Sequence, residues 1–147
     1  MAPTRAVLSG LNIVAKDMNA TLAFYRKLGV DIPDTAVWGT STGAHHITIP
    51  LRTPVTMELD STSLAGVYNT SYDADDVHRT VIGFSLETRD AVDEVFAEMT
   101  ADGYNGVQTP WDAFWGARYA ILEDPEGNHV GIMSPSEEQH RSTPPDI

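Results

Sequence analysis

The sequence predicts an α+β protein built from two tandem βαβββ modules within one structural domain. Three observations support this prediction. Two alternating apolar runs, residues 10–17 and 83–90, each end in an acidic residue and lie 73 positions apart. A helix-spaced apolar segment follows each run, and a strand-rich stretch follows each of these segments. A repeat of this length in a chain of 147 residues indicates two similar modules that form one unit.

The first module begins with a predicted strand at residues 10–15, where side chains alternate between the two faces. Asp17 follows at a position suited to a helix N-cap, and apolar residues then recur at helical spacing until Gly29. Three further strands are predicted at residues 36–40, 45–51 and 55–60.

The second module follows the same plan. Its first strand covers residues 84–88, Asp90 is the N-cap candidate, and the apolar stripe of its helix ends at Gly103. Its remaining strands are predicted at residues 106–109, 118–123 and 129–133. The last two are separated by Asp-Pro-Glu-Gly-Asn, a strong turn signal because Pro fixes φ and Gly and Asn tolerate positive φ.

These boundaries divide the chain into a first module at residues 1–75, a second at 76–135 and a flexible tail at 136–147. The tail has no apolar period, and Pro144 and Pro145 cannot continue a helix or a central strand.

Composition excludes several classes of function. Twenty-one acidic against nine basic residues give a formal net charge of −12, which repels a phosphate backbone and argues against nucleic acid as a partner. Without cysteine the chain has no disulfide, thiolate nucleophile or Cys-ligated zinc. No apolar run is long enough for a signal peptide or a membrane span, so we expect a cytoplasmic protein with no membrane partner.

Two motifs carry a family resemblance. Phe24-Tyr25 lies on the first predicted helix, and Trp115-Gly-Ala-Arg118 precedes the Asp-Pro-Glu-Gly-Asn turn. With the order of the elements, they resemble the glyoxalase/bleomycin-resistance/dioxygenase superfamily, also called vicinal oxygen chelate proteins, over residues 7 to about 135. The resemblance implies curved mixed sheets that enclose a cavity, commonly in a homodimer.

The resemblance also implies where metal-dependent members would hold their ion. The first-strand ligand position falls on Gly10 and Gly83, and the last-strand position falls on Glu58 and Gly131. Glycine has no donor side chain, and one carboxylate cannot satisfy an ion that takes about four to six ligands. We therefore expect no metal and no other cofactor, and a cavity enlarged in front of the three glycines.

Strand alternation and aromatic content select the ligand-binding candidates. Glu58 shares a strand face with Asp60. It is a charge partner for a cationic ligand, an acid with a raised pKa if it is buried among apolar groups, or a solvated carboxylate at a cavity rim. Arg118 either anchors an acidic ligand group or pairs with Asp124. Aromatic rings would hold a flat heterocycle, or else cover the sheet or a dimer interface. The candidates are Asn12, Trp38, His46, Glu58, Trp111, Phe114, Trp115, Arg118 and His129.

The histidines leave two interpretations open. His45 and His46 are adjacent on a strand, so only one of them can enter a cavity. His46, His129 and Glu58 would form a replacement metal site if the fold brought them together, and are otherwise structural residues.

The leading hypothesis is a metal-independent homodimer, without catalytic residues, that sequesters an aromatic antibiotic or natural product, cationic or neutral. The bleomycin-resistance branch, to which the chain is similar in character, implies this drug-resistance role. The alternative is an enzyme of the same superfamily, such as a lyase, isomerase or dioxygenase, that uses Glu58 with a displaced metal or as a metal-free base. A regulatory or purely structural module is a third class.

Overall fold

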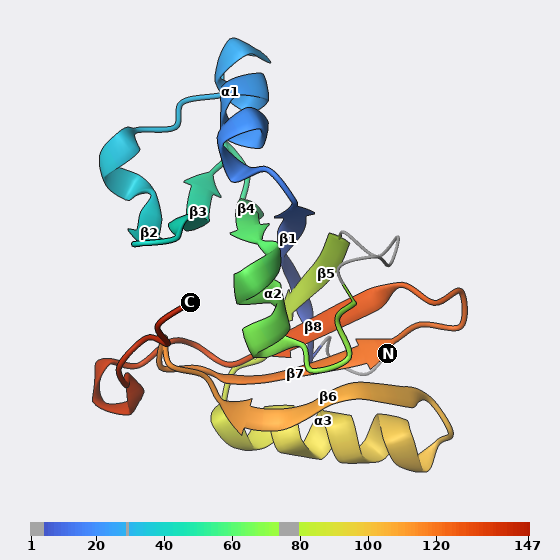
Figure 1. Ribbon diagram of the computed structural model, residues 1–147. Coiled ribbons are helices and arrows are strands. Elements are labelled where there is room, and N and C mark those ends of the chain that lie inside the picture. Colours follow the sequence, from blue (N-terminus) through green and yellow to red (C-terminus); the bar gives the residue numbers. More distant parts are fainter. Residues whose placement is uncertain (1–4, 29, 74–79) are drawn as a thin grey trace.

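The computed structural model describes residues 5–28, 30–73 and 80–147, so the predicted module boundary near residue 75 lies outside the described residues (Figure 1). The first half contains β1 (Val7–Ala15), α1 (Met18–Leu28), the 3-10 turn η1 (Asp34–Ala36), β2 (Trp38–Thr40), β3 (Gly43–Pro50), β4 (Thr56–Ser61) and α2 (Thr62–Tyr68). The second half contains β5 (Thr80–Ser85), α3 (Arg89–Ala101), β6 (Asn105–Asp112), β7 (Arg118–Glu123), β8 (His129–Met133) and the 3-10 turn η2 (Glu138–His140). The predicted α+β class is confirmed.

The strands form one eight-stranded mixed sheet in the order β2-β3-β4-β1-β5-β8-β7-β6. Within each half the first and last strands are parallel, β1 with β4 and β5 with β8. The halves join through the antiparallel pair β1–β5, where Gly10 lies opposite Gly83. Figure 1 shows β3 and β4 to the upper left of β1, and β6–β8 below the β1–β5 pair. The sequence repeat is therefore a repeat across one shared sheet.

Two helices cover the outer face of the sheet, one in each half. α1 contacts β3 and β4, where Ile47, Ile49 and Leu59 are buried, and α3 packs on β6, β7 and β8 over Ala120 and Ile132. None of the described helices is both long and apolar enough to cross a bilayer. Because side chains alternate along a strand, the residues between these buried ones face the inner side of the sheet.

The helix starts follow local capping chemistry. The Asp17 carboxylate accepts a hydrogen bond from the Ala20 amide at 2.9 Å, as predicted for an N-cap. In α3 the cap is Thr88, whose hydroxyl accepts from the Ala91 amide at 3.1 Å, and the predicted cap Asp90 lies in the first turn. Gly29, the predicted end of α1, lies outside the described residues.

Several elements differ from the prediction. β5 covers Thr80–Ser85, whereas the sequence predicted a strand at residues 84–88, and Thr88 is instead the N-cap of α3. α2 was not predicted: the Ser61 hydroxyl accepts from the Leu64 amide at 3.1 Å and begins a short helix directly after β4. Figure 1 shows α2 between the two halves. β6 continues to Asp112, past the predicted end at residue 109, and includes Pro110. A proline is tolerated there because β6 is an edge strand.

The C-terminal segment, residues 136–147, packs against the second half, whereas the sequence predicted a flexible tail. The Glu137 amide donates to the Gly116 carbonyl and the Ser142 amide to the Phe114 carbonyl, both at 3.0 Å. Gly116 has a φ of 95°, and a Cβ there would collide with the Glu137 carbonyl oxygen. Glycine at this position is therefore what lets the segment lie on the loop before β7.

The end of this segment also reaches the first half. The Ile147 carbonyl accepts hydrogen bonds from the hydroxyls of Thr40 and Thr42, the latter at 2.6 Å. The segment thus connects the β6–β7 loop with the β2–β3 turn.

Candidate functional site

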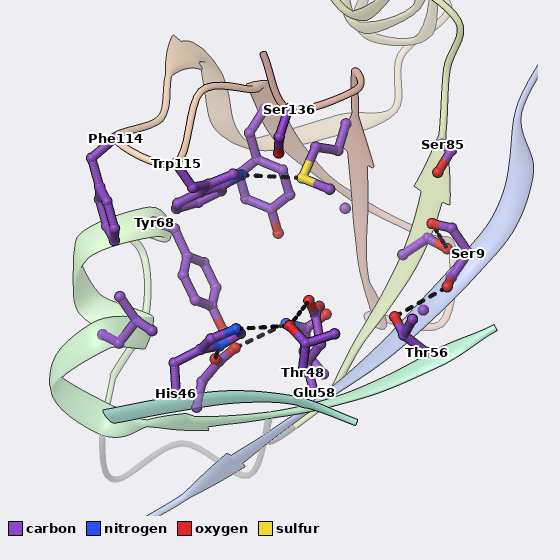
Figure 2. Close-up of a pocket in the computed structure, with 18 of the residues that line it drawn as sticks. Ser9, His46, Thr48, Thr56, Glu58, Tyr68, Ser85, Phe114, Trp115 and Ser136 are labelled. Carbon is purple, nitrogen blue, oxygen red and sulfur yellow. Dashed lines mark hydrogen bonds and ion pairs between the residues drawn. The ribbon is translucent and has the colours of Figure 1, made fainter. Parts of the chain in front are cut away.

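A cavity of about 770 Å³ lies on the inner side of the sheet, between the two halves (Figure 2). This volume falls in the range of roughly 300–1,000 Å³ that is typical of small-molecule sites. Strands of both halves, α2 and the C-terminal segment all contribute to its lining.

The structure brings most of the predicted site residues together. The cavity lining includes Asn12, Trp38, His46, Glu58, Phe114 and Trp115. It also includes the three glycines at the metal-ligand positions, Gly10, Gly83 and Gly131. Trp111, Arg118 and His129 lie outside it.

The polar wall of the cavity is organised around Asp60, whose side chain is only 2% exposed. Its carboxylate accepts hydrogen bonds from Asn12 Nδ2 at 2.9 Å, from the Tyr68 hydroxyl at 3.0 Å and from His46 Nδ1 at 2.5 Å. Three donors, one of them on an ionisable ring, offset much of the cost of burying this charge. The network ties β1, β3, β4 and α2 together.

The network continues from His46 to Glu58 through a threonine hydroxyl (Figure 2). His46 Nε2 lies 3.0 Å from Thr48 Oγ1, which lies 3.2 Å from Glu58 Oε1. Burial raises the pKa of Glu58, and the nearby charge of Asp60 adds to the effect. Burial lowers the pKa of His46, but its hydrogen bond to Asp60 and the charge of that carboxylate outweigh burial and raise it.

The opposite wall is aromatic and centres on Trp115. Its indole makes edge contacts with Phe114 at a centroid distance of 5.2 Å, Tyr119 at 5.6 Å and Tyr68 at 6.5 Å. Its Nε1 donates to Met133 Sδ at 3.3 Å. These contacts fix the ring before a ligand arrives, and each such aromatic pair contributes roughly 0.5–1.5 kcal/mol beyond area burial.

Trp111 supports this wall without lining the cavity. Its ring lies 5.8 Å from that of Trp115 in an edge contact with an interplanar angle of 87°. The structure therefore does not place Trp111 on the cavity surface, where the sequence predicted it. It packs behind Trp115, which lines the cavity.

Arg118 faces α3, away from the cavity. It pairs with Asp93 at 2.8 Å and with Asp112 at 3.1 Å, and not with the predicted partner Asp124. Asp124 instead accepts hydrogen bonds from Asn128 within its own turn. The physical reason is strand alternation, because the neighbouring residue, Tyr119, is the one that lines the cavity.

His129 is buried beside the end of α2, where its Nδ1 lies 3.2 Å from Asn69 Nδ2. Its Nε2 lies 3.9 Å from Glu123 Oε2. Since it does not line the cavity that contains His46 and Glu58, the three residues do not form a replacement metal site.

The residues present do not fit the metal that the superfamily resemblance implies. Three of the four ligand positions are glycine, and Glu58 is the remaining donor. Within residues 5–28, 30–73 and 80–147, no group of three or more His, Cys, Asp or Glu side chains is placed to hold a metal ion. No step of a mechanism can therefore be assigned to a metal at these positions.

The glycines do not all leave open space, contrary to expectation. A Cβ on Gly131 would lie 2.8 Å from the Tyr119 hydroxyl and 3.2 Å from Val81 Cγ1, so Tyr119 occupies the space in front of this glycine. A Cβ on Gly83 would lie 3.3 Å from the Gly10 carbonyl oxygen. Burial raises the pKa of Tyr119, with contributions from the nearby carboxylates, so its phenol remains a neutral donor.

Sequence reasoning did not select several lining residues: Thr48, Asp60, Tyr68, Tyr119 and Met133. Strand alternation had placed Asp60 on the face of Glu58 and Met133 on the face of Gly131, which was a usable signal for both. The missing information was the register of β3 against β4, which sets His46 opposite Asp60 and Thr48 opposite Glu58.

Comparisons with known proteins agree with this architecture. The family model of the Glyoxalase/Bleomycin resistance protein/Dioxygenase superfamily matches residues 7–132. A Legionella pneumophila structure described as NAD-dependent benzaldehyde dehydrogenase aligns with a TM-score of 0.61 at 15% identity, covering 85% of this chain and 96% of that one. A superfamily member from Vibrio splendidus 12B01 aligns with a TM-score of 0.54 at 11% identity, covering 88% of this chain and 99% of that one.

The Mn(II)-bound glyoxalase from Novosphingobium aromaticivorans aligns with a TM-score of 0.53 at 19% identity. The alignment covers 97% of this chain and 42% of that one. At such identities the similarity shows a shared fold, not a shared activity. No curated protein matches this chain.

Proposed function

Since this chain belongs to the Glyoxalase/Bleomycin resistance protein/Dioxygenase superfamily, we propose that it is a metal-independent binding protein that sequesters a planar aromatic antibiotic or natural product. The observation that carries the proposal is a cavity with a preorganised aromatic wall on one side and a carboxylate-containing polar wall on the other. Glycine at three of the four metal-ligand positions supports binding without a metal.

The two walls define how a ligand would lie. A flat ring system packs against Trp115 and Phe114, which present apolar surface and aromatic edges. A hydrogen-bond donor or a positive charge on the ligand faces Glu58 and the network of Asp60.

The proposal includes a cytoplasmic homodimer, which the superfamily resemblance implies. Exposed apolar side chains on β1 support a contact surface, with Val7 58%, Leu8 46% and Leu11 38% exposed. Light scattering of the purified protein at several concentrations measures its mass, and a monomer at every concentration would contradict this part.

Calorimetric titration with a panel of planar aromatic compounds tests the proposal. We expect at least one compound to bind, and the Trp115→Leu variant to bind it at least tenfold more weakly, a loss of about 1.4 kcal/mol. The control is Tyr104→Leu, because Tyr104 is an exposed aromatic residue outside the cavity. Recovery of the compound intact is also expected, and its conversion with turnover would overturn a sequestering role.

A second candidate function is metal-free acid–base catalysis by a lyase or isomerase. The observation in its favour is the 2.5 Å contact between His46 and Asp60, which orients an imidazole in a cavity that also contains Glu58. A pH-dependent turnover that is lost in Glu58→Gln would select this candidate, whereas unchanged ligand binding without turnover counts against it.

A further inference from the structure

The two hydrogen-bond contacts of Thr48, with His46 and with Glu58, cannot both form when the histidine is neutral and Glu58 is ionised, because one donor proton is missing. Thr48 has a single hydroxyl proton, and its oxygen lies 3.0 Å from His46 Nε2 and 3.2 Å from Glu58 Oε1. A neutral imidazole whose Nδ1–H donates to Asp60 offers only an acceptor at Nε2, and an ionised Glu58 is also an acceptor. The threonine can then donate to one of its two neighbours and not to the other.

One added proton satisfies both contacts of Thr48. If the proton is on His46 Nε2, the histidine donates to Thr48 and Thr48 donates to Glu58. If it is on Glu58, the carboxylic acid donates to Thr48 and Thr48 donates to His46. The two arrangements contain the same atoms and the same charge, so the added proton belongs to the pair and not to one residue.

The surrounding groups favour the form that holds this proton. Asp60 faces the pair from β4, Tyr68 from α2 and Tyr119 from β7, and both phenols have a raised pKa, chiefly because they are buried. Arg141, in the C-terminal segment, is the sole Lys or Arg among the described residues that line the cavity, and it pairs with Glu138 at 3.4 Å. The raised pKa values of Glu58 and His46 agree with a site that retains an extra proton.

We propose that His46, Thr48 and Glu58 share one displaceable proton, so that the cavity selects organic cations and releases this proton when it binds them. The proposal rests on the binding function proposed above and names the charge class of the ligand. With the proton, His46, Glu58 and Asp60 together carry one net negative charge; without it they carry two. A cation therefore binds the deprotonated form more tightly, and its binding expels the proton.

The linkage has a defined direction with pH. The affinity for a cation rises as the pH increases through the apparent pKa of the shared proton, because fewer molecules then hold a proton that must leave. A neutral ligand of the same shape shows a weaker dependence on pH, because it offers no charge to the carboxylates.

The test uses proflavine as a planar aromatic cation and acridone as a neutral compound of similar shape. Calorimetric titrations in two buffers with different ionisation heats count the protons released per ligand. We expect up to one proton released per bound proflavine and clearly fewer per bound acridone. In Glu58→Gln we expect proflavine affinity to fall about tenfold, as for one partly screened charge contact, and proton release to fall below half of its original value. Acridone affinity should fall less, because acridone offers an N–H donor but no charge.

A second measurement examines the shared proton without any ligand. NMR titration of the His46 ring nitrogens in Thr48→Val is expected to give a lower pKa than in the original protein, because the Nε2–H of the charged ring loses its acceptor. Thr109→Val is the matched control, since Thr109 is an exposed strand residue outside the cavity, and it should leave the titration unchanged.

The possible outcomes separate the two proposals. Proflavine binding with neither proton release nor pH dependence would overturn the shared-proton inference and leave the binding function standing. Failure of proflavine, acridone and the wider panel of aromatic compounds to bind would overturn the binding function and the cation selectivity with it. If His46 titrates identically in Thr48→Val and in the original protein, the shared-proton inference is overturned, regardless of the ligand-binding results.

Discussion

The two halves place different chemistry at equivalent positions of the same hairpin. The facing pairs are His46–Asp60 and Thr48–Glu58 in β3 and β4, and, 73 residues later, Tyr119–Met133 and Ile121–Gly131 in β7 and β8. One backbone register therefore supports an ionisable network in the first half and an aromatic and apolar surface in the second. The difference creates a cavity with two unlike walls, which can bind a ring system and a polar group at the same time.

The repeat is not uniform along the parallel pairs. Gly83 lies opposite Gly131 in the second half, whereas Gly10 lies opposite Thr56 and Asn12 lies opposite Glu58 in the first. The shift by two residues keeps every side chain on its face, because strands have a period of two. It places Asn12 beside the acidic residues, where it donates to Asp60 at 2.9 Å.

The largest expected effect comes from a leucine at Asp60 in β4, compared with a leucine at the equivalent residue Met133 in β8. Asp60→Leu leaves the donors of Asn12, Tyr68 and His46 without their buried acceptor, so we expect the free energy of unfolding to fall by about 3 kcal/mol. Met133→Leu should cost less than about 1.5 kcal/mol, because it exchanges apolar groups of similar volume. Urea denaturation measures both, and equal losses would contradict the assigned difference between the halves.

A smaller loss is expected when a side chain is added at Gly131. Gly131→Ala places a methyl group against the Tyr119 hydroxyl, and we expect a loss of about 2 kcal/mol that Tyr119→Phe partly restores. Gly66→Ala is the control, because a Cβ there meets nothing within 4 Å and α2 should gain about 0.5–1 kcal/mol. Thermal or urea unfolding measures the stability of each variant. A Gly131→Ala variant as stable as the original protein would show that the Tyr119 side chain moves aside at no cost.

The third prediction concerns the pH dependence of stability. Because the folded state raises the pKa of Glu58, it binds this proton more tightly than the unfolded chain does. Stability from this group is present below the ordinary glutamate pKa and is lost as the pH rises through the raised value. The raised pKa of His46 adds a second loss of the same sign, which begins near the ordinary histidine pKa.

In Glu58→Gln the loss of stability that comes from Glu58 should disappear. The loss that comes from His46 should remain but become smaller, because the charge of Glu58 contributes to the raised pKa of His46. Urea midpoints measured from about pH 4 to pH 9 provide the comparison. The control is Met133→Leu, which changes the equivalent wall without a titrating group and should retain both losses. A Glu58→Gln curve that parallels the original at every pH would show that burial does not shift this carboxyl.

The smallest expected effect concerns the connection between the halves made by the C-terminal segment. Thr42→Val removes one hydroxyl that donates to the Ile147 carbonyl. We expect the free energy of unfolding to fall by at most about 1 kcal/mol. Hydrogen exchange should accelerate at Ser142, whose amide donates to Phe114, more than at amides of β7. Unchanged exchange at Ser142 would show that the segment is held by its contacts with the second half alone.

The sequence predicted the parts of this molecule that depend on local periodicity. Alternation identified most of the strands, although it placed β5 at residues 84–88 instead of Thr80–Ser85. It also put His45 and His46 on opposite faces, because the face of a strand residue follows from parity. The short helix α2 was missed because seven residues contain too few helical repeats to reveal a period, and with it Tyr68 was missed. Arg118 was misplaced because alternation along β7 gives the cavity face to Tyr119. His129 was misplaced because its partner Asn69 comes from a segment distant in sequence.

The pairing of Gly10 with Gly83 has a mechanical consequence for the cavity. The two walls belong to different halves of the sheet, and β1–β5 is the strand pair that joins them. Neither glycine contributes a side chain at this pair, and a Cβ on Gly83 would lie 3.3 Å from the Gly10 carbonyl oxygen. We therefore expect the sheet to bend at the β1–β5 pair, so that the distance between the two walls adjusts to ligands of different thickness. Spin labels on β3 and β7 would report the change in distance.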